Sequence, residues 1–534
     1  MMAGRALLAV AALALLVGAS TASAETVLKR GNGGEPKSLD PHYADLTMET
    51  NIIGDMLIGL TTEDAAGNAM PGAATRWDVS PDGKTWTFHI RNHLWSDGLP
   101  VTAQDFLFAW QRILNPKLAA PYAYQLWVVK NAKAISDGKM PPSALGVTAP
   151  DDKTLVVQLE HPAPYLPELL THLATYPVPR HVVMAKGNAW SKVGNYVSNG
   201  PYVVTEWVPN DHVTLSKNPK FYDAAHVRID RVEYYPTNDA VAAIKWVRGG
   251  VIDTQNPFPA ILIDWLRANM PKALQMIPYL SVYYVNFNMT RKPFNDVRVR
   301  EAMNLAFDRE IVTDKIIKLG EPPAYGMVPP NTTNYPGGAT MGFRSMPYAE
   351  RIKRAQALMR AAGYGPNNRL RVTYATTTNT DSIRMAAAFQ SMLRAIYVDA
   401  SIVQSEVQVH YKKLETGDFD LAYANWVADF NDATNFLDLL RCGNGDNWGN
   451  NYAHYCNKDY DGLLDKANQQ TDLKTRGELL RQAEDIALKD FAWIPVRFSN
   501  TLDIVQPYVK GWISNAREIN RSRWLWIEKQ TAAR

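Results

Sequence analysis

A strand that leads directly into a helix constrains the fold of this 534-residue chain more than any other feature. Residues 419–426 (FDLAYANW) alternate enough between apolar and polar side chains to predict a buried strand. Residues 434–440 (TNFLDLL) repeat apolar side chains at the spacing of a helix face, with Thr434 as the expected N-cap. This order predicts an α/β domain whose polar groups lie on a loop at a strand end, held by a rigid frame.

The loop between this strand and this helix combines an aromatic side chain, Trp426, with two carboxylates, Asp429 and Asp432. Asp is also a common turn and capping residue, so a purely structural role is an equal alternative at the level of sequence. We interpret Asp429 as the anion that receives the positive charge of a ligand. We interpret Asp432 as a turn residue whose replacement barely alters folding.

The first 24 residues predict a secretory signal peptide. Arg5 precedes an apolar run over residues 6–17, and Ala22-Ser23-Ala24 has the small side chains of a signal-peptidase site. The run is too short to span a bilayer, and no later stretch approaches the ~20 apolar residues that a span requires. We therefore expect cleavage after Ala24 and a soluble mature protein in the periplasm.

The balance of charges argues against some classes of partner, and the length and the aromatic content indicate a large folded protein. The chain has 56 Lys and Arg against 53 Asp and Glu, so no strong field favours nucleic acid or a membrane. The roughly 510 mature residues predict two to four domains with ample core. The 15 tryptophans and 25 tyrosines supply aromatic groups that build cores and also line sites for organic ligands.

The only two cysteines, Cys442 and Cys456, flank a segment rich in Gly and Asn. Their spacing fits no zinc pattern, and no histidine pair completes one. In an oxidising compartment such a pair predicts a disulfide, and two reduced cysteines buried apart are the alternative.

The most specific motifs lie in a predicted hairpin and the helix that follows it. Residues 85–91 alternate behind the Asp82-Gly83 turn, and Thr102 is expected to cap a helix over residues 103–114. DGKTWTFHIR and WSDGLPVTAQDF, which follow Trp77, resemble the signature of the peptide/nickel-type solute-binding receptors that feed ATP-binding-cassette importers. The likeness continues in order along the mature chain, at residues 197–224, 294–312, 345–365 and 380–396.

The resemblance implies an α/β fold of two lobes, the Venus-flytrap fold of periplasmic binding proteins, with an extra inserted domain. The chain is expected to cross the hinge between the lobes twice. The expected divisions are residues 25–57, 183–280 and 496–534 for lobe I, residues 58–182 for the inserted subdomain, and residues 281–495 for lobe II.

The resemblance also implies a peptide extended between the closed lobes, with its backbone paired to strand-like segments of the protein. Asp429 stands where the family's carboxylate meets the α-ammonium of the peptide, and Tyr122 matches a tyrosine that helps to hold this terminus. The pairing segments are expected at Asp45, Leu46 and Thr47 and at Asn425, Trp426 and Val427, with Asn256 as a further polar contact.

The chain departs from well-matched oligopeptide receptors at the other end of the peptide. Ile317 and Tyr423 stand where those receptors carry basic side chains that reach the C-terminal carboxylate. Arg384 and Lys318 are candidate substitutes. The departure allows longer peptides, capped peptides or another cationic solute.

Together these features predict a non-catalytic, monomeric receptor that binds an oligopeptide and delivers it to an inner-membrane ABC permease. We expect no cofactor, no metal site and no nucleic-acid partner. A receptor of the same fold for a dipeptide, a murein peptide, a nickel chelate or an opine is the alternative. A secreted hydrolase is a remote alternative, because the sequence has no GxSxG, HExxH or CxxC motif.

Overall fold

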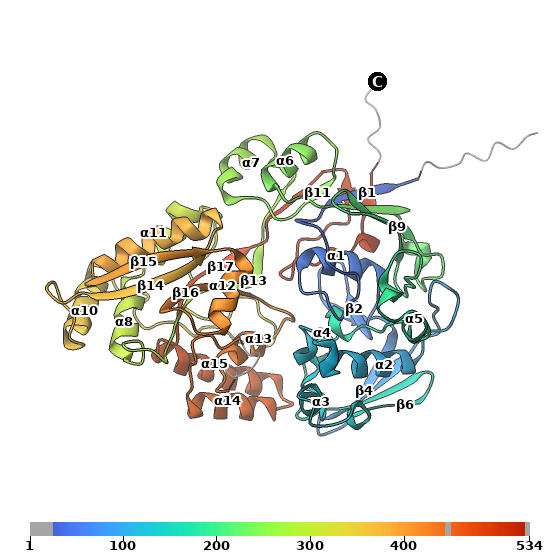
Figure 1. Ribbon diagram of the computed structural model, residues 1–534, viewed down its shortest axis with the longest axis horizontal. Helices are drawn as coiled ribbons and strands as arrows, with labels where there is room; N and C mark the ends of the chain where they lie inside the picture. The colour runs from blue at the N-terminus through green and yellow to red at the C-terminus, as the bar shows by residue number, and fades with distance from the viewer. Residues whose placement is uncertain (1–24, 444–449, 529–534) are drawn as a thin grey trace, which may run out of the picture.

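The computed structural model describes residues 25–443 and 450–528, so the predicted signal peptide lies outside the described residues. The described chain forms an α/β structure with two halves side by side, which are joined near the top of the view in Figure 1. None of the described helices is long and apolar enough to cross a membrane.

One half is built on a seven-stranded mixed sheet with the order β12-β18-β11-β1-β10-β9-β8. The first strand of the described chain, β1, lies inside this sheet and pairs in parallel with β10 and β11. Its strands are β1 (Val27–Gly31), β8 (Tyr202–Val208), β9 (His212–Lys217), β10 (Arg231–Tyr235), β11 (Thr254–Gln255), β12 (Leu274–Gln275) and β18 (Asp503–Val505). The helices of this half include α1 (Thr47–Met56), α5 (Arg180–Lys186), α6 (Ala240–Arg248) and α7 (Ile263–Asn269).

A separate four-stranded antiparallel sheet, ordered β4-β5-β7-β6, lies below the first (Figure 1). The predicted hairpin is present, and Gly83 has a φ of +69° in its turn, a conformation that favours glycine. The predicted helix begins after its N-cap Thr102, whose backbone N–H donates to Asp105 at 2.9 Å. The elements are β4 (Ala74–Val79), β5 (Thr85–Ile90), β6 (Val147–Asp151), β7 (Thr154–Gln158), α2 (Ala103–Ile113), α3 (Ala132–Ser136) and α4 (Leu166–Leu169), with a small hairpin of β2 (Thr61–Glu63) and β3 (Ala69–Pro71) before them.

The other half is built on a five-stranded mixed sheet with the order β15-β14-β16-β13-β17. Strand β14 pairs in parallel with β15 and β16, while β13 runs antiparallel to β16 and β17. The strands are β13 (Pro278–Phe287), β14 (Leu370–Thr377), β15 (Val398–Ser405), β16 (Leu421–Val427) and β17 (Trp493–Asn500). The helices are α8 (Val297–Ala306), α9 (Arg309–Ile311), α10 (Tyr348–Ala361), α11 (Thr380–Arg394), α12 (Val407–Glu415), α13 (Thr434–Leu437), α14 (Lys458–Asn468) and α15 (Leu473–Lys489), with a π-helical segment η8 (Val312–Ile317) after α9.

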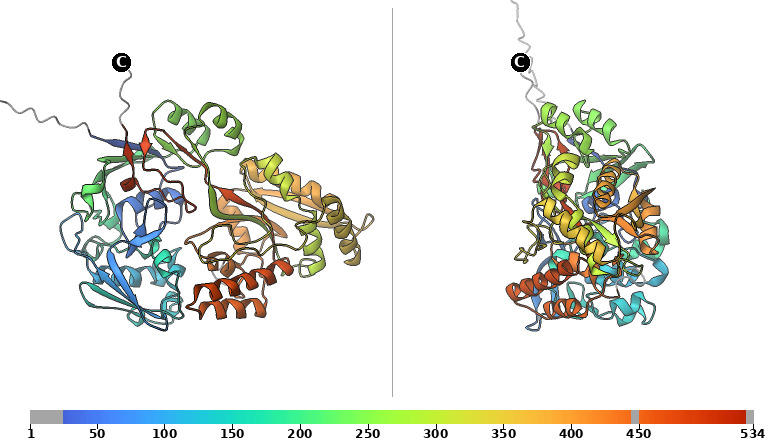
Figure 2. Two further views of the ribbon diagram at one scale, coloured as in Figure 1. Left: turned by 180° about the vertical axis from the view of Figure 1, so that it is seen from behind. Right: turned by 90° about the vertical axis from the view of Figure 1, so that its left-hand side faces the viewer.

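Two strands carry the chain between the halves, and they run through the expected boundaries at residues 280/281 and 495/496. The chain enters the five-stranded sheet through β13 and leaves it through β17. These two strands form the end of the sheet that is nearer to the seven-stranded sheet (Figure 2). The two connections bond to each other, because the backbone N–H of Thr501 donates to the carbonyl of Ile277 at 2.8 Å. The hinge is therefore a pair of adjacent strands.

Cys442 and Cys456 are joined by a disulfide, as predicted. The bond connects the segment after α13 to the residue that precedes Asn457, the N-cap of α14. The alternative of two separate reduced cysteines is therefore excluded in this structure.

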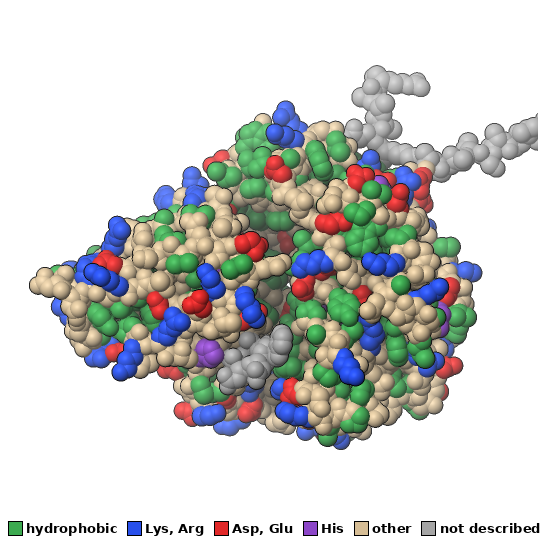
Figure 3. Space-filling model, viewed as in Figure 1, with side chains coloured by type: hydrophobic (Ala, Val, Ile, Leu, Met, Phe, Trp, Pro, Cys, Tyr) green, Lys and Arg blue, Asp and Glu red, His purple; other side chains and the backbone are tan. Residues whose placement is uncertain are grey.

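The buried apolar side chains form two cores. One surrounds the five-stranded sheet and extends to Ile244 of α6 and Leu266 of α7, and the other lies in the rest of the other half. Phe430 follows a strand of the five-stranded sheet, yet it packs into the core of the other half. Its ring stacks on that of Tyr165 with 5.1 Å between centroids. The face shown in Figure 3 is hollowed between the two halves, and its cationic and anionic side chains are intermixed.

Candidate ligand-binding site

The loop that carries Asp429 is held in place by a buried ion pair. Asp432 accepts hydrogen bonds of 2.7 and 2.8 Å from the guanidinium of Arg476 on α15, and both side chains are almost fully buried. The expectation that Asp432 is a dispensable turn residue is therefore wrong. Nothing in the local sequence indicates the pairing, because Arg476 lies 44 residues further along the chain.

The start of α13 also differs from the sequence expectation. Ala433 is the N-cap and Thr434 is the first helical residue, so Thr434 does not cap the helix. The Thr434 hydroxyl donates instead to Asp432 at 2.6 Å. The buried carboxylate of Asp432 thus binds both the helix start and Arg476, which fixes the conformation of the loop.

Asp429 lies where three distant segments of the chain meet. The Tyr124 hydroxyl donates to its Oδ2 at 3.0 Å from a short 3-10 helix, η2 (Ala123–Leu126), in the other half of the molecule. Asn435 accepts the backbone N–H of Asp429 at 3.1 Å. Arg517, near the C-terminus, donates to the backbone carbonyl of Asp429 at 3.2 Å. The carboxylate is therefore positioned from both halves.

The environment of Asp429 suits it to hold a cation. Burial raises the pKa of Asp429 to about 6, although the hydrogen bond from Tyr124, the nearby polar side chains of Asn435 and Gln125 and the charge of Arg517 act in the opposite direction. Within the described residues, no salt bridge reaches its carboxylate, since Arg517 binds the backbone carbonyl and pairs with Glu168. A positively charged group of a ligand at this position would contact the Asp429 carboxylate, which otherwise accepts hydrogen bonds only from neutral donors.

A cavity of about 390 Å³ opens beside Asp429, between η2 and the loop after β16. Tyr124, Gln125 and Trp127 line it from one half of the molecule. Trp426, Asp429 and Asn435 line it from the other, and the Trp426 indole donates to Asn435 at 2.8 Å. The cavity is large enough for part of an organic ligand and contains the proposed anchor.

Tyr122, predicted to help hold the ligand terminus, lies near Asp429 but does not bond to it. Its ring packs against those of Tyr124 and His172, at 5.5 and 4.6 Å between centroids. Burial, then the charges of Asp429 and Asp45, raise the pKa of Tyr122, which places all three groups in one region. Tyr124 makes the direct contact and was missed, because the sequence PYAY does not show which tyrosine points to the loop.

The two predicted pairing segments belong to different halves of the molecule. Asp45 and Thr47 are exposed and Leu46 is half-buried, at the start of α1. The backbone N–H groups of Asp45 and Leu46 already donate to Glu49, at 2.9 and 3.1 Å. Asn425, Trp426 and Val427 are half-buried at the end of β16.

Two further predicted residues are engaged elsewhere. The side-chain amide of Asn256 donates to Asp503 at 2.7 Å, next to the strands that connect the halves. Tyr423 is buried, with its ring 5.8 Å from that of Tyr283 between centroids. Neither residue lines the cavity beside Asp429. Their role in ligand binding stays a prediction.

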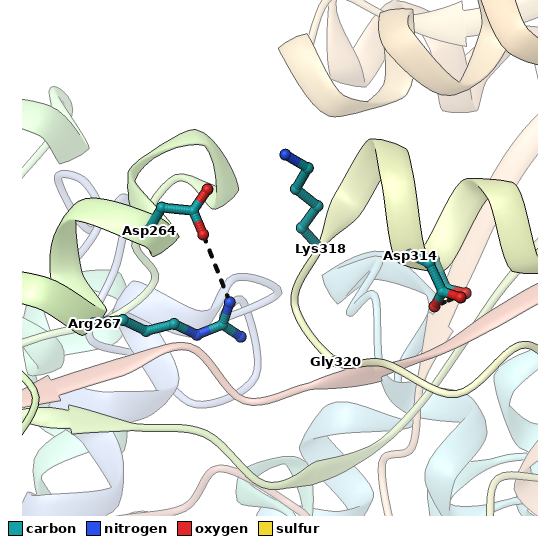
Figure 4. Close-up of a pocket in the computed structure, with 6 residues that line it drawn as sticks. Asp264, Arg267, Asp314, Lys318 and Gly320 are labelled. Atoms are coloured by element: carbon teal, nitrogen blue, oxygen red, sulfur yellow. Dashed lines mark hydrogen bonds and ion pairs between the residues drawn. The ribbon is translucent and has the colours of Figure 1, made fainter.

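The residues considered for the C-terminal end of a peptide also lie outside the cavity beside Asp429. Arg384 pairs with Asp381 at 3.3 Å, and Ile317 is buried. Lys318 lines a second cavity, of about 380 Å³, where it faces Asp264 and Arg267 of α7 (Figure 4). This second cavity lies between α7 on one side and η8 with the residues that follow it on the other, and Asp429 does not line it.

Comparison with known proteins identifies the family. Residues 68–448 match the family model described as bacterial extracellular solute-binding proteins, family 5 middle. The chain is 36% identical over 500 residues to the periplasmic oligopeptide-binding protein OppA of Escherichia coli, covering 92% of this chain and 90% of that protein. It is 35% identical over 509 residues to the probable deoxycholate-binding periplasmic protein YgiS of the same organism, covering 94% of each.

A solved structure shows the same fold. Haemophilus influenzae OppA, in complex with the peptide RPPGFSPFR, superposes with a TM-score of 0.83 at 33% sequence identity. The match covers 95% of this chain and 99% of that one. The expected two-lobed α/β fold is therefore confirmed.

Replacing Asp432 by asparagine should destabilise the protein strongly. Arg476 would remain buried without its counter-charge, which costs about 3–5 kcal/mol in the free energy of unfolding. Chemical denaturation measures the change. Asp485→Asn, which breaks the more exposed pair with Arg481 on α15, is the matched control and should cost less than about 1 kcal/mol. Equal small losses in both variants would contradict the structural role of Asp432.

Asp429→Asn should instead stabilise the ligand-free protein at neutral pH, by about 1–3 kcal/mol. The folded pKa of about 6 lies above the ordinary pKa of 3.8 for aspartate, so the native state binds more protons than the unfolded state between these two pH values. The wild type therefore loses stability as pH rises through this window, whereas the variant does not. Denaturation at pH 4 and pH 8 measures the difference, which should be near zero at the lower pH. A variant less stable than wild type at pH 8 would contradict a half-buried carboxylate without a counter-charge.

Proposed function

The chain belongs to the bacterial extracellular solute-binding proteins of family 5, and we propose that it is a periplasmic receptor that captures oligopeptides between its two lobes. It then delivers them to an inner-membrane ABC importer. The names of the curated relatives support this function, since OppA of E. coli is a periplasmic oligopeptide-binding protein. So does the solved neighbour from H. influenzae, whose complex contains a peptide.

The observation that carries the proposal is the position of Asp429. Its carboxylate belongs to the five-stranded half, and the hydroxyl that binds it, from Tyr124, belongs to the other half. A peptide α-ammonium at this carboxylate would make a charge-assisted contact worth about 1.5–3 kcal/mol. It would also fix which end of the peptide lies here. Because such a ligand touches both halves only when they are closed, its binding favours the closed state.

The peptide backbone would pair with the end of β16, at Asn425, Trp426 and Val427, and with the segment at residues 45–47. The N–H groups of Asp45 and Leu46 are bound to Glu49, and the Leu46 carbonyl accepts the N–H groups of Glu49 and Thr50. The pairing at this segment would therefore use the Asp45 carbonyl and the Thr47 N–H. Side chains of the peptide would then alternate between the two walls.

The remaining parts of the proposal follow from the sequence. The receptor would be exported by its signal peptide, act as a monomer without catalytic activity, and divide into lobe I, an inserted subdomain and lobe II. The related proteins in the family are binding proteins. The importer would recognise the closed, liganded form.

A receptor of the same fold for another solute is the second candidate. Its support is the similar identity to YgiS, a probable deoxycholate-binding protein. The pairing of Arg384 with Asp381 and of Arg497 with Glu321 also leaves these cations without an obvious role toward a ligand carboxylate. Mass spectrometry of small molecules that co-purify with the exported protein separates the candidates.

Asp429→Asn should weaken binding of peptides with a free N-terminus by roughly 30-fold to several thousand-fold, or about 2–5 kcal/mol. The ammonium would then be buried without a full counter-charge. Titration calorimetry with matched free and N-acetylated peptides of three to five residues measures the effect. Acetylated peptides should bind the wild type poorly and lose little more in the variant, because the coupled group is already absent.

Asp485→Asn is the matched control for this measurement, because its pair with Arg481 lies on α15 and it should leave peptide affinity unchanged. Equal affinity of the wild type for free and acetylated peptides would show that Asp429 is not the ammonium anchor. Peptide cleavage during the titration would contradict the non-catalytic function.

A further inference from the structure

Gln125 brings a buried hydrogen-bond donor without a partner to the cavity beside Asp429. The residue lies in η2, next to Tyr124, and lines this cavity. It is 3% exposed, yet its Nε2 has no hydrogen-bond partner among the described residues. Buried polar groups are normally satisfied, and a buried donor without a partner lowers stability. The amide is therefore suited to a partner that arrives with the ligand.

The amide of Gln125 also lies close to the anchor at Asp429. Burial raises the pKa of Asp429, and the Gln125 amide is one of the groups that act against this rise. The carboxylate itself accepts the Tyr124 hydroxyl at 3.0 Å, whereas Gln125 Nε2 makes no hydrogen bond to it. An amide nitrogen has two N–H groups, so it can face the carboxylate and still donate to a ligand atom beside it.

Trp127, two residues further along the chain, lines the same cavity and has a similar donor. Its indole Nε1 is buried and has no partner in the part of the chain that the structure describes. The ammonium of Lys133 lies 4.3 Å from the ring centroid, but an ammonium is itself a donor and cannot accept this N–H. Gln125 and Trp127 therefore offer this cavity N–H groups, which bind an acceptor and not a cation.

An anion beside an unused donor is complementary to a cation beside an acceptor. The first residue of a peptide has this arrangement, because a single carbon atom, Cα, joins its ammonium nitrogen to its carbonyl carbon. A simple amine or polyamine carries the cation without the acceptor. The pair of Asp429 and Gln125 thus matches an α-aminoacyl group better than an ammonium group alone.

We propose that Gln125 donates a hydrogen bond to the carbonyl oxygen of the first residue of the bound peptide, while Asp429 binds the α-ammonium of the same residue. Gln125 is then a specificity-determining residue for ligands that begin with an α-amino acid. The carbonyl oxygen has two lone pairs, so it can accept this bond and also pair with a backbone N–H of the protein. This inference rests on the proposed function, since it assumes that a peptide binds with its N-terminus at Asp429.

The test compares Ala-Ala-Ala with an analogue whose first peptide bond is replaced by a trans carbon–carbon double bond. The analogue keeps the shape and the ammonium and lacks the carbonyl oxygen. It also lacks the N–H of that bond, but this loss affects the wild type and a Gln125 variant alike. Gln125→Met keeps the length of the side chain and removes its amide. In calorimetry, the preference for Ala-Ala-Ala over the analogue should be roughly threefold to tenfold larger in the wild type than in Gln125→Met.

Gln104→Met is the matched control. Gln104, on α2 and outside the cavity, donates through its Nε2 to the Ala149 carbonyl at 3.1 Å. Its replacement breaks this bond, so it should lower the melting temperature and leave the affinity for both ligands unchanged. Gln125→Met removes a donor that has no partner, so the ligand-free variant should keep or raise the melting temperature.

The outcomes separate this inference from the proposed function. If the preference for Ala-Ala-Ala is the same in the wild type and in Gln125→Met, the inference is overturned and the peptide-receptor function stands. The inference is also overturned if Gln125→Met lowers the melting temperature as much as Gln104→Met, because the amide then has a partner within the protein. If neither Ala-Ala-Ala nor any other peptide with a free N-terminus binds the wild type or raises its melting temperature, the proposed function itself fails.

Discussion

The ion pair between Asp432 and Arg476 fixes the loop on which the candidate site depends. Both side chains are almost fully buried, so the pair tolerates little movement, and Asp432 also binds the first residue of α13. Two residues earlier, Phe430 stacks on Tyr165 of the other half. Asp429 directly precedes this aromatic residue and lies three residues before the buried carboxylate of Asp432. Its position is therefore determined by residues that never need to touch a ligand.

This arrangement leaves the carboxylate of Asp429 poorly solvated and without a counter-charge. Its negative charge therefore does not stabilise the folded protein. Neutral donors, such as the Tyr124 hydroxyl, orient the carboxylate without neutralising it. Burial of an unpaired charge lowers stability, and proteins accept such a cost mainly at functional sites. The interaction that would offset it is a cation brought by the ligand. Because Tyr124 and Asp429 come from different halves, this cation would also stabilise their association.

Much of the fold could be predicted from local sequence patterns. The hairpin around Gly83, the helix after Thr102 and the disulfide each depend on signals within a few residues or on a single pair of cysteines. Asp429 could be singled out because strand and helix periodicity place it at the end of a strand. The contacts that position Asp429 could not be predicted in this way. Arg476 and Tyr124 lie far away in sequence, and neither the ion pair of Asp432 nor the choice of Tyr124 over Tyr122 leaves a local pattern.

The most direct test of Asp429 as the receptor of a positive charge is the number of protons released on binding. At pH 6 the carboxylate is about half protonated, given its pKa of about 6, while a peptide α-ammonium is fully protonated. Titration calorimetry in two buffers of different ionisation enthalpy should therefore show about 0.5 proton released per peptide bound to the wild type. Asp429→Asn should release none. Binding to the wild type without proton release, or with the same release in the variant, would contradict this role.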